Sequence, residues 1–249
     1  MTVNIMSDLN KKNNLTVIGA LDSHDRLKQI LRTYAPCKIL DIPAGTGVLS
    51  DFLQREGFDV SAGDIDIGNF QLEGKIPFNT VNLNRPLSYS DDSFDMILSA
   101  NGLHRIFNLG GAIRELGRIL KPEGTLIINL NNYANLRYRL RFLIYGSIDN
   151  AVNAGLCHQS LDDPEAHVRI PVLLPNVINN LHKSNFEVIS ISPGAVRRET
   201  LFLKPIGWLI KLLALLVPKK SRLRSHLDLT NSESVLNGGR YLTIVAKKK

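Results

Sequence analysis

Two carboxylates and two glycines early in the chain have a spacing that suits nucleotide binding. Asp41 ends a short apolar run, and Gly45 and Gly47 follow in the next few residues. Glycine lets the backbone approach a ligand closely, and a helix that starts beyond such a turn offers unpaired N–H groups. Asp64 comes 19 residues after Gly45, a spacing typical of an acid that accepts the ribose hydroxyls of a nucleotide. These residues predict a site for a ligand that contains a nucleoside.

The elements that must position these residues alternate between strand and helix. Residues 39–42 form an apolar run typical of a buried strand, and residues 48–56 continue with helical periodicity. A second strand over residues 58–63 leads to Asp64. A dinucleotide fingerprint would require glycine or alanine where Ser50 stands, so the sequence favours a different nucleotide.

The pattern Asp-x-x-x-Gly-x-Gly over residues 41–47 resembles motif I of the class I, Rossmann-like methyltransferases that use S-adenosylmethionine. Residues 60–64 are similar to the family motif that ends in the ribose-binding acid, which selects Asp64 over Asp66. Residues 92–99 resemble the family's Ser-Phe-Asp turn and the strand after it.

Residues 118–124 add a match to the family's Arg-Val-Leu-Lys-Pro-Gly-Gly turn, so the motifs occur in the family's order between residues 24 and 131. The resemblance implies that Asp41 suits the cationic methionyl end of the cofactor and that Ile65 packs on the adenine. Asn82 stands where relatives often carry an acid, and its amide can still accept a hydrogen bond. The residues implied to bind S-adenosylmethionine, or its product S-adenosylhomocysteine, are Asp41, Pro43, Ala44, Gly45, Gly47, Asp64, Ile65, Asn82, Leu83, Ser99 and Ala100.

The expected fold class is α/β, a doubly wound and mostly parallel seven-stranded sheet, in which the resemblance makes the last strand antiparallel. Ser23 is the expected cap of a helix over residues 24–34, and the third strand is expected to begin at Thr80. The remaining expected elements are helices over 108–120, 136–145 and 175–184, and strands over 94–99, 125–130, 186–192 and 240–246.

A single methyltransferase domain over residues 1–249 accounts for a chain of this length with 44% hydrophobic residues. Residues 1–22 are expected to be a loose tail, and residues 132–180 and 197–238 to be substrate-side insert or lid segments. The two cysteines have no metal-ligand spacing, and the acid and histidine residues within 158–167 show no ligand pattern, so no metal is predicted. The composition favours a cytoplasmic protein.

The net charge of +7 is concentrated near the C-terminus, where residues 197–249 hold twelve basic against three acidic side chains. Such asymmetry is found in proteins that bind nucleic acid, anionic lipid or phosphorylated substrates. The region has few aromatic residues, Trp208 and Tyr241 besides Phe202, which disfavours a base-stacking nucleic-acid platform.

Residues 201–217 are apolar apart from a narrow seam of Lys204, Gly207 and Lys211, and they are too short and too polar for a membrane span. The favoured interpretation is a lid helix buried against the sheet or against a dimer partner. The other is an interfacial helix within residues 201–224 that grips anionic lipid headgroups, which would make the protein peripheral to a membrane.

The function predicted is methyl transfer from S-adenosylmethionine to an oxygen or nitrogen of a small-molecule, glycan or lipid-linked acceptor. His104 is the first candidate base and His167 the second, although His104 could equally cap the end of a strand. Two alternatives remain open, a non-catalytic partner subunit with the same fold and an RNA methyltransferase that uses the basic C-terminal region.

Overall fold

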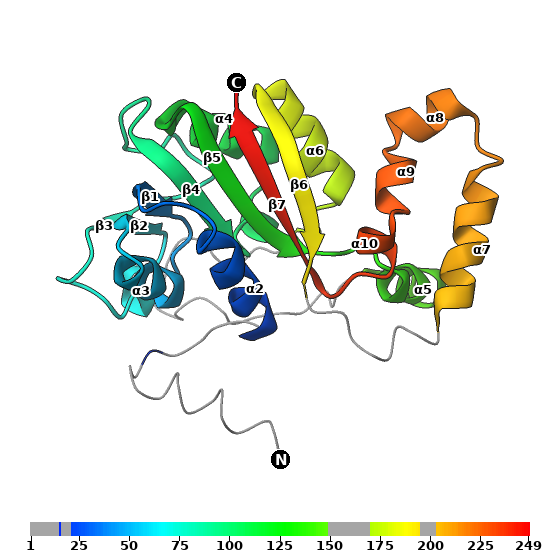
Figure 1. Ribbon diagram of the computed structural model, residues 1–249, viewed down its shortest axis with the longest axis horizontal. Helices are drawn as coiled ribbons and strands as arrows, with labels where there is room; N and C mark the ends of the chain where they lie inside the picture. Colours follow the sequence, from blue (N-terminus) through cyan, green and yellow to red (C-terminus); the bar gives the residue numbers. More distant parts are fainter. Residues whose placement is uncertain (1–14, 16–20, 149–169, 195–202) are drawn as a thin grey trace, which may run out of the picture.

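A seven-stranded sheet in the order β3-β2-β1-β4-β5-β7-β6 forms the centre of the molecule (Figure 1). The computed structural model describes residues 15, 21–148, 170–194 and 203–249. The strands are β1 (Lys38–Asp41), β2 (Asp59–Asp64), β3 (Phe78–Thr80), β4 (Phe94–Ala100), β5 (Leu120–Asn131), β6 (Phe186–Pro193) and β7 (Tyr241–Lys248). β7 runs antiparallel to β5 and β6, and β1 to β5 pair in parallel, which confirms the predicted sheet.

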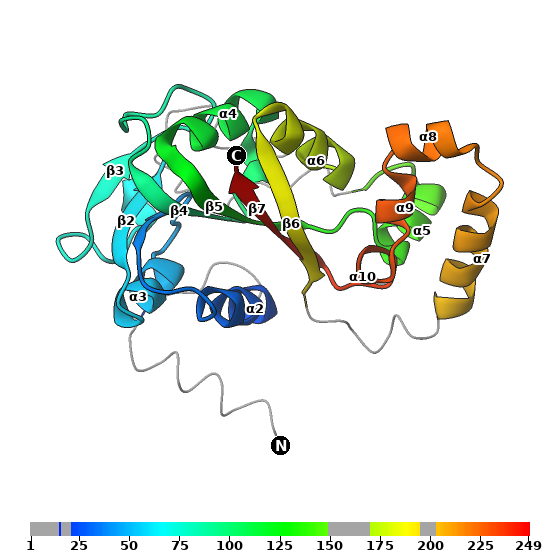
Figure 2. The same ribbon diagram turned by 45° about the horizontal axis from the view of Figure 1, so that its top comes forward.

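Helices cover both faces of this sheet (Figures 1 and 2). They are α2 (Leu21–Leu31), α3 (Val48–Arg55), α4 (Leu109–Ile119), α5 (Leu136–Tyr145), α6 (Leu174–Lys183), α7 (Lys204–Ala214), α8 (Lys219–Arg224), α9 (Leu227–Thr230) and α10 (Glu233–Leu236), with short 3-10 helices η1 (Ile67–Asn69) and η2 (Leu103–Arg105).

Successive strand residues point to opposite faces, and two hydrophobic cores result. Leu40 packs in the core with α4 and α6, whereas its neighbour Ile39 packs in the core with α2 and α3. Both residues are fully buried. This burial on both faces explains why the parallel strands read as continuous apolar runs rather than as alternating ones.

The α2 and β3 boundaries differ from the expectation. The predicted capping role of Ser23 is wrong, because Ser23 lies inside α2 and its hydroxyl donates a 2.9 Å hydrogen bond to Oδ1 of Asn129 on β5. This buried contact ties the helix to the sheet. β3 ends at Thr80 instead of starting there, so Asn82 belongs to the loop that follows the strand.

The Lys121–Gly124 segment, expected to be a turn before the fifth strand, is an irregular part of β5 itself. Leu120 pairs with Phe94, and the ladder resumes with Thr125 opposite Met96. Glu123 takes a left-handed backbone conformation, with φ 63°, within this irregularity. The extra residues therefore interrupt the pairing of β5 with β4 inside the strand.

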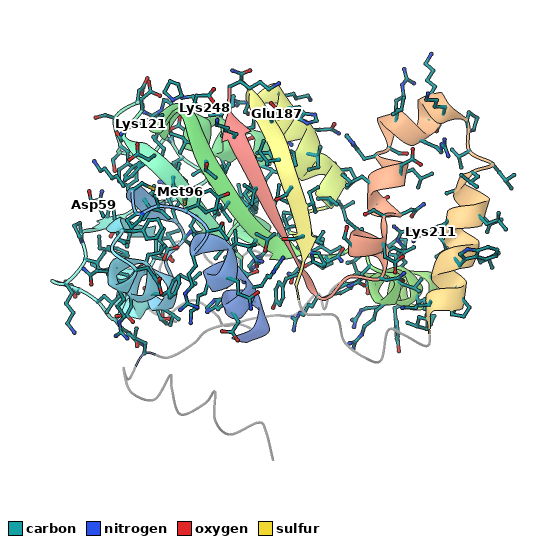
Figure 3. The ribbon with its side chains drawn as sticks, in the orientation of Figure 1. Asp59, Met96, Lys121, Glu187, Lys211 and Lys248 are labelled. Atoms are coloured by element: carbon teal, nitrogen blue, oxygen red, sulfur yellow. The ribbon has the colours of Figure 1, made fainter. Side chains whose placement is uncertain are left out.

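Helices α5 and α7 to α10 gather beyond the end of the sheet at which β5 and β6 end and β7 begins (Figures 1 and 2). Lys211 of α7 lies on the side of that helix that faces α10, far from Lys121 and Lys248 at the opposite end of the sheet (Figure 3). The expectation that this helix is buried against the sheet is wrong, because Gly207 is its only buried residue. Within the described ranges, no helix has the length and apolar character required to cross a membrane.

Candidate functional site

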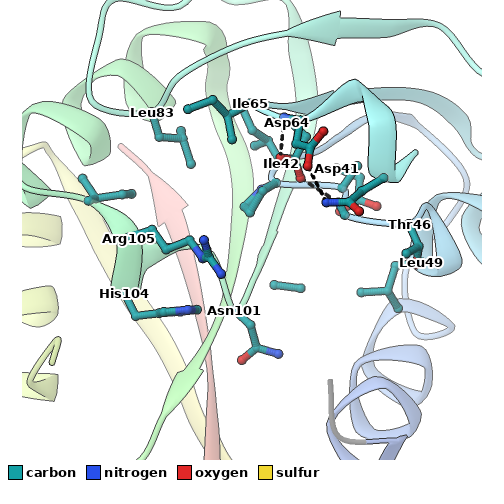
Figure 4. Close-up of a pocket in the computed structure, with 18 of the residues that line it drawn as sticks. Asp41, Ile42, Thr46, Leu49, Asp64, Ile65, Leu83, Asn101, His104 and Arg105 are labelled. Atoms are coloured by element: carbon teal, nitrogen blue, oxygen red, sulfur yellow. Dashed lines mark hydrogen bonds between the residues drawn. The ribbon is translucent and has the colours of Figure 1, made fainter. Parts of the chain in front are cut away.

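A cavity of about 440 Å³ opens at the carboxyl ends of β1, β2 and β4 (Figure 4). Ligands of open α/β sheets bind at this edge, because the loops that leave the parallel strands converge there. The cavity is large enough for a nucleoside-sized ligand together with part of a second molecule.

The turn between β1 and α3 forms one wall of the cavity. Gly45 and Gly47 both have positive φ, 55° and 86°, which side-chain-bearing residues rarely adopt. The N–H of Gly47 donates to the Ala44 carbonyl at 3.0 Å, and the N–H of Ala44 donates to the Gly63 carbonyl at 2.9 Å. These bonds hold the turn against the end of β2.

Asp64 joins this turn to the second strand. Its Oδ2 accepts a 2.8 Å hydrogen bond from the N–H of Gly45, and its Oδ1 accepts a 3.2 Å hydrogen bond from the N–H of Asp66. Burial raises the pKa of the Asp64 carboxyl group, and the backbone hydrogen bonds oppose that effect. Each carboxylate oxygen has a second lone pair and can accept a further hydrogen bond from a ligand.

Asp41 is buried at the end of β1, where it also lines the cavity. The Ser50 hydroxyl donates to its Oδ2 at 2.6 Å, and its Oδ1 has no hydrogen-bond partner among the described residues. Burial raises the pKa of Asp41 to about 7, although the hydrogen bond from Ser50 acts in the opposite direction. A buried carboxylate with one unsatisfied oxygen suits a cationic or hydrogen-bond-donating ligand.

Asp66 has a local structural role although it also lines the cavity. Its carboxylate accepts hydrogen bonds from the N–H of Gly68 at 2.9 Å and from Nδ2 of Asn69 at 2.6 Å. It thereby caps η1. This arrangement distinguishes Asp66 from Asp64, whose carboxylate spans two different strand ends.

The structure brings together at the cavity most residues that the sequence predicts for cofactor binding. Those that line it are Asp41, Pro43, Ala44, Gly45, Asp64, Ile65, Asn82, Leu83 and Ala100. Gly47 and Ser99 do not line it. Gly47 packs toward Phe70 and Leu72 at the start of α3, and Ser99 is fully buried inside β4. Their predicted contact with the cofactor stays a prediction.

His104 and Arg105 lie across the cavity from Asp64 and Thr46 (Figure 4). Both belong to η2, the short helix after β4. Gly102 just before it packs on the ring of Pro43, where a side chain of any size would collide. The backbone of His104 is fixed as well, since its carbonyl accepts a 2.7 Å hydrogen bond from the N–H of Ile170. His167, the second candidate base, lies outside the described residues.

Sequence reasoning missed several residues of the cavity wall, including His24, Asn131, Arg240 and Tyr241. His24 comes from α2, and burial followed by the charge of Lys28 lowers its pKa, which favours the neutral imidazole. Tyr241 begins β7 and Arg240 directly precedes it, and the antiparallel pairing of β7 with β5 brings both to this edge. No local motif signals such residues.

Across the parts of the chain that the structure describes, no group of three or more His, Cys, Asp or Glu side chains is placed to hold a metal ion. The acid and histidine residues at 158–167 lie outside those parts.

Comparison with known proteins gives a family match and a fold match. Residues 40–128 match the family model described as a methyltransferase domain. Over 135 residues the chain is 30% identical to the demethylmenaquinone methyltransferase of Clavibacter sepedonicus, a match that covers 50% of this chain and 54% of that protein. The chain spans about half the length, or less, of the first curated relatives it matches.

Two solved structures show the fold similarity. A methyltransferase from Archaeoglobus fulgidus superposes with a TM-score of 0.58 at 18% identity, covering 90% of this chain and 94% of the other. The 1,6-didemethyltoxoflavin-N1-methyltransferase of Burkholderia thailandensis, solved with bound 1,6-didemethyltoxoflavin and S-adenosylhomocysteine, gives a TM-score of 0.54 at 14% identity, covering 91% of this chain and 78% of the other. At these identities the likeness shows the fold alone.

Proposed function

Residues 40–128 place the chain in the class I methyltransferase family, and from this premise we propose that it transfers a methyl group from S-adenosylmethionine to a small-molecule, glycan or lipid-linked acceptor. One observation carries the proposal. The N–H of Gly45 donates a 2.8 Å hydrogen bond to Asp64, and both residues line the same cavity. The glycine turn and the carboxylate predicted to bind the ribose are therefore held together at one site.

The residues of the cavity fit this cofactor. Oδ1 of Asp41 is a buried acceptor without a protein partner, which the cationic methionyl group of the cofactor would satisfy. No atom lies within 4 Å of the point where Gly45 would carry a side chain, so the backbone turn faces open space. Asp64 keeps acceptor capacity for ribose hydroxyls beyond its two backbone hydrogen bonds.

Four residues would hold the two ends of the cofactor. Asp41 would hold the methionyl ammonium group and Asp64 the ribose, while Ile65 and Leu83 would contact the adenine as apolar wall residues. When bound, S-adenosylmethionine supplies an electrophilic methyl group on a sulfonium sulfur. The chain's own contribution is to orient that group toward an acceptor and to exclude water, since positioning accounts for much of the acceleration in displacement reactions.

The cavity wall also holds basic residues. The side chains of Arg105 and Arg240 line it together with His104. Guanidinium groups bind carboxylates and phosphates with strong, directional hydrogen bonds, so we propose an acceptor that carries an anionic group. In this scheme the His104 imidazole takes the proton of the acceptor oxygen or nitrogen as the new bond to carbon forms.

Isothermal titration calorimetry with S-adenosylmethionine, S-adenosylhomocysteine and NAD tests the cofactor assignment. We expect the first two ligands to bind and NAD to bind much more weakly. Tight binding of NAD with no response to the other two would contradict the assignment.

Transfer of labelled methyl to a panel of acceptors tests the activity. The panel should contain demethylmenaquinone, because one matched relative is named for it, and carboxylated and phosphorylated small molecules. Total RNA is included as an acceptor to test the alternative that the protein is an RNA methyltransferase. Cofactor binding without transfer to any acceptor, together with a stable complex with another protein, would favour a non-catalytic partner subunit instead.

A further inference from the structure

Exposed hydrophobic side chains are concentrated on two neighbouring regions of the described chain. Twelve of its sixteen exposed large hydrophobic residues lie at the end of α5, on α7, in the turn after α7, or on α8. They are Phe142, Leu143, Ile144, Tyr145, Ile206, Trp208, Leu209, Leu212, Leu213, Leu215, Leu216 and Leu223. Both views place α5 beside α7 and α10 (Figures 1 and 2). Exposed apolar patches of this kind mark contact with an apolar partner.

Helix α7 turns its polar seam inward. Nζ of Lys211 donates a 2.6 Å hydrogen bond to Oε2 of Glu233 on α10, and Nδ2 of Asn237 donates to the other oxygen of Glu233 at 2.8 Å. Gly207 allows the helix to approach closely, since a side chain there would lie 3.0 Å from Oδ1 of Asn237. The orientation of α7 is therefore fixed by specific contacts to α10.

The opposite face of α7 is an apolar stripe in water. Trp208, Leu209, Leu212 and Leu213 follow one another at helical spacing, and Leu216 extends the stripe into the turn after α7. Trp208 and Leu216 are 69% and 80% exposed. An apolar helix face normally packs on a core. Here the internal contacts of the helix leave that face for something outside the described chain.

The charges beside this stripe indicate what covers it. No acidic residue occurs between Leu203 and Leu227, whereas Lys219, Lys220 and Arg224 are exposed on α8. Arg222 differs from these three because it forms a 3.7 Å ion pair with Asp228. A second copy of the chain packed through this face would set two such basic groups together without acids to offset them. An anionic partner fits the charge.

We propose that α7, the turn to Val217, and α8 form a docking surface for an anionic lipid bilayer. The apolar stripe lies in the boundary between headgroups and acyl chains, and Lys219, Lys220 and Arg224 contact the headgroups. The eleven residues of α7 span about 16 Å, roughly half of a hydrocarbon core of about 30 Å, so the helix lies on the bilayer and does not cross it.

The docking surface is connected to the cavity wall. α10, which anchors α7, leads through Asn237 into Arg240 and Tyr241 of the cavity. Nδ2 of Asn132 donates to the Val235 carbonyl at 2.8 Å and so fixes α10 to the end of β5. Together with the proposed function, this connection favours an acceptor that resides in the membrane. Docking itself requires no methyl transfer.

Trp208 gives a direct measurement, because it is the only tryptophan in the chain and lies on the stripe. The full-length protein is mixed with vesicles of phosphatidylcholine alone or with added phosphatidylglycerol, and binding is followed by Trp208 fluorescence and by sedimentation. We expect a blue shift and pelleting with the anionic vesicles only. Raising the salt from ~0.1 M to ~1 M should weaken binding, because the Debye length falls from about 10 Å to about 3 Å.

Two sets of variants separate the electrostatic and apolar contributions. Replacing Lys219, Lys220 and Arg224 by Gln should weaken binding roughly 100-fold, from about fivefold per basic residue at an anionic surface. Replacing Lys75, Lys183 and Arg114 by Gln removes the same charge from exposed positions on other elements and should have little effect. The double substitution Leu212→Asp and Leu216→Asp should abolish binding while leaving Tm and affinity for S-adenosylhomocysteine unchanged.

Two results would overturn the proposal. One is that the unmodified protein, shown to be folded by its binding of S-adenosylhomocysteine, fails to bind anionic vesicles at low salt. The other is that sedimentation velocity shows a dimer that the Leu212→Asp and Leu216→Asp substitutions convert to a monomer, which would assign the stripe to a second copy. Loss of methyl transfer with vesicle binding retained would bear on the proposed function and leave the docking surface standing.

Discussion

The Ser50 hydroxyl donates a 2.6 Å hydrogen bond to one oxygen of Asp41, and the other oxygen of that buried carboxylate has no partner among the described residues. Ser50, in the first turn of α3, thus supplies a hydrogen bond to one of the two carboxylate oxygens of Asp41 at the end of β1. Asp41 lines the cavity, so a ligand that donates a hydrogen bond there could satisfy the remaining oxygen. This arrangement links the stability of the unliganded protein to its affinity for a cationic ligand.

Asp41→Asn should change the pH dependence of both properties. Burial raises the pKa of Asp41 to about 7, so the folded protein holds this proton more tightly than the unfolded chain. Stability of the unliganded wild type therefore falls as pH rises from about 4 to about 7, by ~4 kcal/mol at most. The asparagine variant lacks this loss and should melt at a higher temperature than wild type at alkaline pH.

Affinity should respond in the opposite sense. Wild-type affinity for S-adenosylmethionine should rise as Asp41 ionises through about pH 7, and the Asn variant should show weaker binding without that rise. Calorimetry and thermal melts across the pH range measure both properties. Equal pH profiles for the two proteins would show that Asp41 does not meet the cationic group.

Asp64→Ala should weaken binding of S-adenosylhomocysteine by about 1.5–3 kcal/mol, the range for hydrogen bonds to charged groups. Asp66→Ala should cost much less, because the Asp66 carboxylate is occupied with capping η1. Asp64→Asn is the matched control, since it keeps an acceptor for the N–H of Gly45. Larger loss from the Asp66 substitution would contradict the assignment of the ribose to Asp64.

His104→Gln should lower kcat by ~10²–10⁴-fold, the range for removing a general base, while cofactor affinity stays near wild type. The backbone carbonyl that binds the N–H of Ile170 is unaffected by this change, so the fold should persist. Single-turnover rates across pH provide the measurement. A variant with normal kcat and a lowered Tm would mean that the histidine only caps the end of the strand.

Gly47→Ala should destabilise the protein by about 1–3 kcal/mol, because its φ of 86° is strained for alanine and its side chain would lie 2.9 Å from Phe70 and Leu72. Gly74→Ala is the control. Gly74 also has a positive φ, 76°, but no atom lies within 4 Å of the added carbon. Denaturant unfolding should therefore show the larger loss at position 47, and equal losses would mean that packing contributes nothing there.

Local patterns predicted much of the fold and the cofactor side of the cavity. Apolar runs, glycine turns and the acids at strand ends are read from neighbouring residues, and Asp41 and Asp64 reach the cavity because parallel strands end at one edge. The bounds of α5 agree with the expected helix for the same reason. Ser23 shows the limit of such patterns, because a distant partner, Asn129, determines what its hydroxyl does.

The acceptor side and the orientation of α7 depend on residues far apart in the sequence. Arg240 reaches the cavity only through the pairing of β7 with β5. The seam of Lys204, Gly207 and Lys211 is visible in the sequence. The rule that apolar helix faces turn inward predicts that the apolar face of α7 is buried, but Gly207 of the seam is the only buried residue of this helix. In the structure this seam faces α10, where Glu233, 22 residues after Lys211, pairs with the Lys211 ammonium group.

The placement of β7 between β5 and β6 has a consequence for the order of folding. β7 completes the sheet by pairing with β5, whose residues precede it by more than 100 positions, and such distant pairings form slowly. Until it inserts, β5 and β6 each present an open edge, and Arg240 and Tyr241 are absent from the cavity. Closure of the sheet and arrival of Arg240 and Tyr241 at the cavity are therefore one event, whereas the cofactor side, built on β1, β2 and β4, does not depend on β7.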